Sequence, residues 1–119
     1  MGVTFLKAKV INPERPEKKS AELEFLVDSG AVYSVVPQSI LKALGIRPVS
    51  SQEFILGNGE IVKKPIGNAY FQYKGQIRAA PVVFGDKGVF LLGATTLEAF
   101  GLMLDPIRRE LKPLPMVLM

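Results

Sequence analysis

The chain has no cysteine and no histidine among its 119 residues. It therefore cannot use Ser-His-Asp or Cys-His catalysis, and it cannot build an ordinary zinc site from those side chains. Disulfide bonds are excluded too, which agrees with a reducing compartment, so we expect a cytoplasmic protein. Carboxylates, lysines and hydroxyl groups remain as the side chains that could carry chemistry.

Long apolar runs and dense basic stretches are also missing. No segment approaches the roughly 18 to 20 unbroken apolar residues of a membrane-spanning helix, so we expect no membrane partner. Fifteen Lys and Arg against eleven Asp and Glu give a net charge of +4, but the cations are scattered in small groups such as Lys63-Lys64 and Arg108-Arg109. Because a nucleic-acid surface usually combines a denser basic stripe with exposed aromatic residues, we expect no nucleic acid as a partner.

Short segments separated by turn residues make up most of the chain. Nine prolines, eleven glycines and 48% hydrophobic residues predict an all-β barrel or sandwich with one or two short helices. The length corresponds to a single domain over residues 1–119. The expected elements are a strand from Thr4 to Ile11, a polar connection from Asn12 to Lys19, a second strand ending at Asp28, a helix from Gln38 to Leu44 after Pro37, and a hairpin with its tip at Gly57-Asn58-Gly59. In this tip, Asn58 and Gly59 are expected to adopt positive φ angles.

The most informative segment is Asp28-Ser29-Gly30-Ala31, which follows the apolar run Phe25-Leu26-Val27. The run predicts a strand that enters an interior buried on both faces. Burying an unpaired carboxylate costs several kcal/mol, so an acid at the end of such a strand needs a partner or a chemical role. Gly30 allows a tight turn and can offer its amide to the carboxylate, while Ser29 can bond to a neighbouring loop. An ordinary turn is the alternative for the triplet alone, because Asp, Ser and Gly are common turn residues.

The second half of the chain repeats the first in outline. Phe25-Leu26-Val27 leads to Gly30-Ala31 and then to Leu41–Ile46, and Val89–Leu92 leads to Gly93-Ala94 and then to Leu97–Leu102. Each unit predicts a buried strand, a Gly-Ala turn, a short helix closed by glycine and an apolar exit. Only the first unit carries an acid, because Leu92 precedes the glycine in the second.

With the Asp turn and the repeat in this order, the chain resembles the retropepsin-like aspartic proteases, the single-domain relatives of pepsin. The resemblance covers residues from about Leu23 to Asp105 and depends mainly on Leu26–Ala31 and Leu91-Leu92-Gly93, with Ser29 where threonine is more frequent. It implies a closed, barrel-like acid protease fold with one lobe per chain. It also implies an aspartic endopeptidase that works as a homodimer on a polypeptide substrate, without a cofactor and without a metal.

The resemblance assigns roles to particular residues. Asp28 would be catalytic, one from each subunit, and Ser29, Gly30 and Ala31 would support the active-site loop. The hairpin would be the flap that closes over substrate. The residues expected to contact substrate are Leu56, Gly57, Asn58, Gly59 and Ile61 in the flap, and Val32, Val89 and Leu91 in the pocket walls.

Several alternatives stay open at this point. The apolar tail from Leu111 to Met119 is expected in a dimer interface, or else folded onto its own subunit. The chain could be a catalytically silent dimerisation or peptide-binding module with the same fold, or a small β-barrel that binds RNA. A Ser-Lys dyad is disfavoured, because neither Ser34 nor Ser39 has a lysine in a setting that would make it a base.

Overall fold

Alternation of apolar and polar side chains builds the first hairpin. In β1 (Phe5–Ile11), Leu6, Ala8 and Val10 are buried, and the residues between them are exposed. β1 pairs antiparallel with β2 (Ser20–Val27), as the sequence predicted. β2 keeps its alternation to the end, since Phe25 and Val27 are buried and Leu26 is half-buried. The expectation that this run is buried on both faces is therefore only partly met.

The computed structural model describes residues 4–17 and 19–118. Lys18 of the polar connection and Met119 of the tail lie outside the described residues. The remaining elements are β3 (Ser34–Pro37), α1 (Gln38–Ala43), β4 (Ser50–Ile55), β5 (Ile61–Tyr73), β6 (Gln76–Gly85), β7 (Leu91–Leu92), α2 (Ala94–Ala99), β8 (Leu102–Asp105) and β9 (Glu110–Pro113). Neither helix in the described part of the chain is long and apolar enough to cross a membrane.

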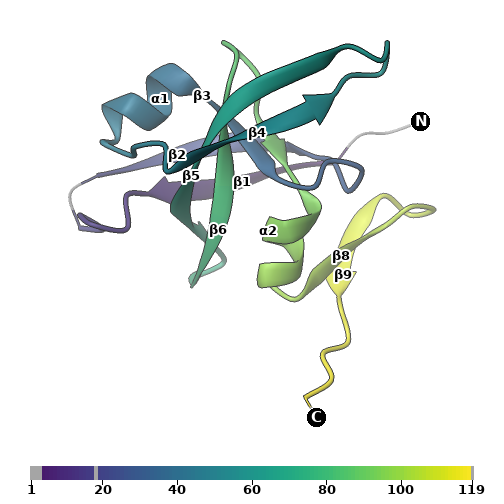
Figure 1. Cartoon of the computed structure of the whole chain (residues 1–119). Helices are drawn as coiled ribbons and strands as arrows, with labels where there is room; N and C mark the ends of the chain where they lie inside the picture. Colours follow the sequence, from purple (N-terminus) through teal and green to yellow (C-terminus); the bar gives the residue numbers. More distant parts are fainter. Residues whose placement is uncertain (1–3, 18, 119) are drawn as a thin grey trace.

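The main sheet closes on itself. Its strand order is β1-β2-β7-β3-β6-β5-β4, and β1 also pairs with β5 through residues 9–11 and 70–72. Strands β1 to β5 in this order therefore form a barrel, and β4 extends it as the outer strand of a hairpin with β5 (Figure 1). The predicted all-β, closed, barrel-like fold with two short helices is confirmed.

The core lies inside this barrel and under the two helices. Phe25 and Phe71 are fully buried and their rings pack with centroids 6.2 Å apart. Leu41 of α1 and Leu97 of α2 are also buried. Burial of such side chains contributes about 1.5–3 kcal/mol each, so the helices are held by packing of one apolar face rather than by their length.

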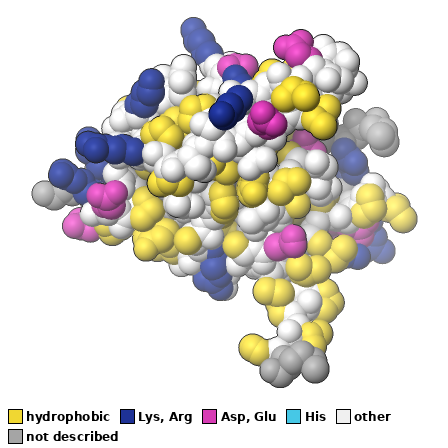
Figure 2. Space-filling view, viewed as in Figure 1, with side chains coloured by type: hydrophobic (Ala, Val, Ile, Leu, Met, Phe, Trp, Pro, Cys, Tyr) yellow, Lys and Arg dark blue, Asp and Glu magenta, His cyan; other side chains and the backbone are white. Residues whose placement is uncertain are grey.

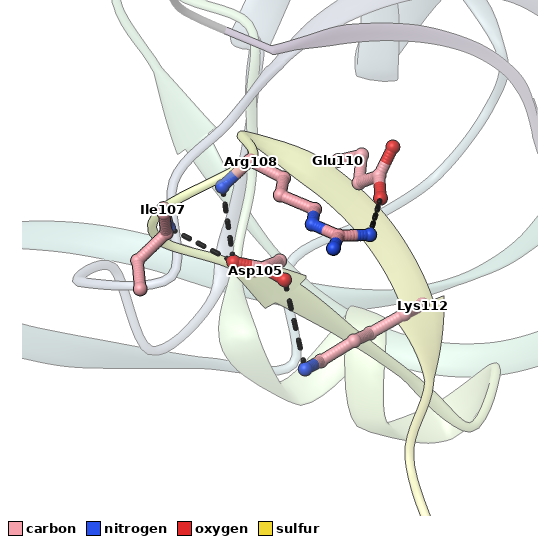
Figure 3. A network of polar contacts seen from close by, with 5 residues as sticks. All are labelled: Asp105, Ile107, Arg108, Glu110 and Lys112. Atoms are coloured by element: carbon pink, nitrogen blue, oxygen red, sulfur yellow. Dashed lines mark hydrogen bonds and ion pairs between the residues drawn. The ribbon is translucent and has the colours of Figure 1, made fainter.

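The C-terminal segment forms a second, smaller sheet in which β8 pairs with β9 (Figure 1). Asp105 holds the turn between them, because its carboxylate accepts hydrogen bonds from the amides of Ile107 and Arg108 and lies 3.6 Å from the Lys112 ammonium (Figure 3). These contacts lower the pKa of Asp105, and the Arg108 amide has the largest effect.

The tail divides between the two expectations. Leu111 packs against the core of its own subunit, and the Leu114 amide bonds to the Gly101 carbonyl at 2.7 Å. Beyond this point Met116, Val117 and Leu118 are 70%, 84% and 85% exposed. The first part of the tail is therefore folded onto its own subunit, while its last described residues are free to meet another surface.

Candidate active site

Asp28 lies at the end of β2, beside the end of the parallel strand β7. The Asp28 amide donates to the Leu92 carbonyl at 3.0 Å, which fixes the backbone at the start of the turn. The carboxylate Oδ1 accepts a 3.0 Å hydrogen bond from the Gly30 amide, and the Ala31 amide bonds to the Asp28 carbonyl at 3.1 Å. Asp28 is half-buried and Ser29 is exposed. The turn therefore presents a carboxylate that is held by backbone but still reachable.

The second repeat unit holds the loop that follows Asp28. The Ala94 amide donates to the Ala31 carbonyl at 2.8 Å, and the Thr95 amide donates to the Val32 carbonyl at 2.9 Å. Gly93 makes this contact possible, since a Cβ there would lie 2.6 Å from the Tyr33 carbonyl oxygen. The two units differ in one respect, because β3 stands between the first turn and α1, whereas α2 begins directly after Gly93. That difference lets the second unit brace the first.

A buried hydroxyl pair locks this arrangement. Ser34 and Thr96 are both fully buried, and their hydroxyl oxygens are 2.6 Å apart. The Ser34 Oγ also accepts a hydrogen bond from the Gly93 amide at 3.0 Å. Sequence reasoning missed this positioning role; the available sign was a hydroxyl residue inside the apolar run after Ala31. With these partners Ser34 is a structural residue, and a Ser-Lys dyad at this position is wrong.

A cavity of about 430 Å³ lies between the Asp28 loop, the β4–β5 hairpin and the segment around β6 and β7. Its walls are mostly apolar. The lining residues are Gly30, Ala31, Val32, Tyr33, Val35, Phe54, Ile55, Leu56, Val62, Lys64, Val83, Gly85, Asp86 and Val89. Because Gly30 and Ala31 belong to both the acid turn and the wall, the carboxylate stands at the edge of an apolar pocket.

The predicted substrate-binding residues divide into two groups around this cavity. Val32, Leu56 and Val89 line it, whereas Gly57, Asn58, Gly59, Ile61 and Leu91 do not. Successive residues of a strand point to opposite faces, so the neighbours of Ile61 in the lining are Val62 and Lys64. Leu91 is paired with Leu26 on one side and Val35 on the other, inside the sheet. Substrate contact stays a prediction for all eight residues.

The hairpin tip has a different turn from the one predicted. Gly59 has a φ of +86°, but Asn58 is not among the residues with positive φ. The Gly59 amide bonds to the Leu56 carbonyl at 2.8 Å, and Asn58 Oδ1 accepts from the Glu60 amide at 2.9 Å. This is the geometry of a turn followed by a left-handed glycine, so only Gly59 needs its conformational freedom.

One ion pair crosses the cavity wall. The Lys64 ammonium of β5 lies 2.9 Å from the Asp86 carboxylate in the loop after β6. The Lys64 side chain is 31% exposed and that of Asp86 is 78% exposed, so solvent screens the pair. The pair links the hairpin to the opposite wall without adding much stability.

Comparison with known proteins supports the fold. No family model matches the chain, and no curated protein matches it either. Among solved structures, the protease of simian foamy virus (mac) matches with a TM-score of 0.57 and 20% identity, over 80% of this chain and 92% of that one. The protease–reverse transcriptase of prototype foamy virus matches with a TM-score of 0.52 and 17% identity, over 97% of this chain and 12% of that one. A retropepsin-like aspartic protease from Rickettsia conorii matches with a TM-score of 0.49 and 20% identity, over 87% and 85% of the two chains.

The protein therefore has the retropepsin-like fold. Identities of 17% to 20% establish the fold and leave the activity to be argued from the site.

Proposed function

We propose that this protein is an aspartic endopeptidase that acts as a homodimer, with Asp28 of each subunit in a shared catalytic pair. One observation carries the proposal. Asp28 is a half-buried carboxylate on a turn fixed by the Leu92 carbonyl and the Gly30 amide, next to an apolar cavity, in a fold shared with foamy virus proteases. A turn with no chemical role would not need to be fixed beside a pocket.

The second carboxyl group has to come from a second chain. The repeat unit that could supply it has Leu92 at the corresponding place, and Leu92 is 2% exposed. A symmetric pair of chains supplies an identical acid turn across a two-fold axis. Two carboxyl groups about 3 Å apart cannot both ionise readily, so the pair holds one proton at acidic pH.

The shared proton gives the two groups different tasks. The ionised Asp28 takes a proton from a water molecule, which attacks the carbonyl carbon of the peptide bond. The protonated Asp28 donates to the carbonyl oxygen as the tetrahedral intermediate forms. Collapse of this intermediate breaks the C–N bond when the nitrogen receives a proton. We expect Ser29, which is exposed, to bond to the partner's turn, and Gly30 to hold the carboxylate.

The cavity and the hairpin fit an extended peptide. The hairpin wall contributes Phe54, Leu56 and Val62, and the opposite wall contributes Val32 and Val89. An extended substrate between hairpin and acids would gain main-chain hydrogen bonds in the manner of an added strand, with alternate side chains in the pockets. We assign the hairpin the role of the flap on this basis.

The proposal is tested by measuring association and cleavage together. Sedimentation velocity and hydrolysis of an apolar reporter peptide are followed across a protein dilution series at acidic pH. Specific activity should fall in step with the dimer fraction, because a monomer holds one acid turn. A monomer with undiminished turnover would contradict the shared pair. A stable dimer that binds the peptide without cleaving it would favour a catalytically silent module.

The exposed end of the tail gives this test a second arm. A chain truncated after Leu114 keeps β9 but loses Met116, Val117 and Leu118. If these residues lie in the interface, truncation should weaken dimerisation and shift the loss of activity to higher protein concentration. An unchanged dimer would remove the tail from the interface and leave the shared pair intact.

A further inference from the structure

A second cleft lies away from the acid turn. It has a volume of about 690 Å³ and shares no lining residue with the apolar cavity. One wall is the β1–β2 connection and the other is the end of α1 with the segment that follows it. The lining residues are Asn12, Glu14, Arg15, Lys19, Lys42, Leu44, Gly45, Ile46, Arg47 and Pro48.

Buried contacts fix the two walls against each other. Asn12 is 6% exposed; its Nδ2 donates to the Leu44 carbonyl at 2.9 Å, and its Oδ1 accepts from the Glu14 amide at 2.8 Å. Gly45 has a φ of +78°, and a Cβ there would lie 3.1 Å from the Asn12 Nδ2. One buried side chain therefore joins segments more than thirty residues apart, so the cleft has a defined shape.

The second wall is also anchored to the barrel. The Val49 amide bonds to the Ile66 carbonyl at 2.9 Å. A Cβ on Gly67 would lie 2.8 Å from the Arg47 carbonyl oxygen, so the backbone at Arg47 packs directly on β5. The charged side chains of this wall therefore extend from a fixed backbone.

Both walls carry cations that lack compensation. Arg15 and Lys19 come from the first wall, and Lys42 and Arg47 come from the second; all four are exposed. Within the described residues, none of the four takes part in an ion pair. Glu14 is the one acid of the lining, so these residues sum to 4 − 1 = +3 in a chain of net charge +4. Figure 2 shows Lys and Arg gathered on the left of the molecule, where α1 and the β1–β2 turn lie in Figure 1.

We propose that this cleft binds an acidic stretch of a polypeptide. Cations on two facing walls match carboxylates spaced along an extended chain, and the positive potential of such a cleft attracts them. The lining contains no aromatic residue on which a nucleic-acid base could stack, and Glu14 stands where a phosphate backbone would be repelled. Leu44, Ile46 and Pro48 give the cleft an apolar component that suits a peptide.

The experiment measures binding of a fluorescent oligoglutamate peptide to the full-length chain by anisotropy. The matched oligoglutamine peptide and an RNA oligomer of equal charge are the comparison probes. Measurements are made at low ionic strength and at about 0.15 M salt, where exposed charges are largely screened beyond about 8 Å. Because cleavage is not measured, failure of the protease proposal does not affect the result.

Variants of each wall identify the site. Arg15→Gln with Lys19→Gln, and Lys42→Gln with Arg47→Gln, should each weaken oligoglutamate binding on the order of tenfold. The control is Lys7→Gln with Lys9→Gln, which lowers the net charge equally on the outward face of β1 and should leave binding within about twofold. Glu14→Gln should strengthen binding by roughly twofold. Unchanged thermal unfolding verifies that each variant is folded.

Three results would overturn the proposal. Equal binding of oligoglutamate and oligoglutamine would remove the charge recognition. An equal loss in the Lys7 and Lys9 control would reduce the effect to net charge. Tighter binding of the RNA oligomer, lost in the wall variants, would assign the cleft to nucleic acid instead.

Discussion

The turn after β2 and the turn after β7 have similar sequences and different surroundings. They lie side by side, because β2 and β7 are parallel neighbours. The Asp28 turn is partly open and borders a cavity, whereas Leu92 and Gly93 are buried against Tyr33 and Ser34. The same local design therefore serves two purposes. The buried turn fixes the backbone of the open one, which is free to present an acid.

The largest expected effect comes from removing the acid of the open turn. Asp28→Asn keeps the shape and the acceptor for the Gly30 amide but removes the shared proton. We expect peptide cleavage to fall by at least about a hundredfold, with an unchanged melting temperature and dimer fraction. Glu98→Gln, an exposed residue of α2, is the matched control. Cleavage within about tenfold of the parent would show that Asp28 is not the catalyst.

The next effect separates the two glycines. In Gly93→Ala the new Cβ would lie 2.6 Å from the Tyr33 backbone, and we expect a loss of about 1–3 kcal/mol or more in the free energy of unfolding. In Gly30→Ala the nearest contact is the Asp28 Oδ1 at 3.2 Å, so the loss should stay below about 1 kcal/mol. Urea denaturation of both variants measures the difference. Equal losses would mean that the two turns are packed alike.

The buried hydroxyl pair should matter somewhat less. Ser34→Ala leaves the Gly93 amide and the Thr96 hydroxyl without their shared partner, which should cost about 1–3 kcal/mol. Thr96→Val removes one bond and keeps the one to Gly93, so its loss should be smaller. A chemical denaturation series of the two variants tests this order. A larger loss for Thr96→Val would indicate that Thr96, not Ser34, is the centre of the network.

The smallest effect is the pH response of the β8–β9 hairpin. The pKa of Asp105 is lowered, first by the Arg108 amide and then by the Ile107 amide. A carboxyl group with a lowered folded-state pKa stabilises the fold above its ordinary pKa of about 3.9, and this stability is lost as the pH falls through the folded value. Asp105 should therefore stay ionised under the mildly acidic conditions in which the proposed pair works.

An NMR titration of the Ile107 and Arg108 amides measures this response. Their signals should keep the hairpin state down to below about pH 4 in the parent. In Asp105→Asn the acid-dependent change should disappear. A transition near neutrality in the parent would assign the hairpin's pH response to another group.

The sequence by itself determined the features that depend on local order. Alternating residues specify the β1–β2 hairpin, Pro37 precedes α1, and Gly45 and Gly101 follow the two helices with positive φ. The Asp28 turn and its Gly30 hydrogen bond were predicted for the same reason, because the interacting groups are two residues apart. The hairpin at residues 54–62 was predicted, although its turn type was not.

The tertiary structure decided what depends on residues far apart in the chain. The contact of Ser34 with Thr96 spans 62 positions, and that of Asn12 with Leu44 spans 32. No local pattern marks such pairs, because they meet only when the barrel closes and the strands take their register. Closure also selected Val62 rather than Ile61 for the cavity and gathered four scattered cations around one cleft. Local sequence determines which turns can form, and packing decides which of them is open for chemistry.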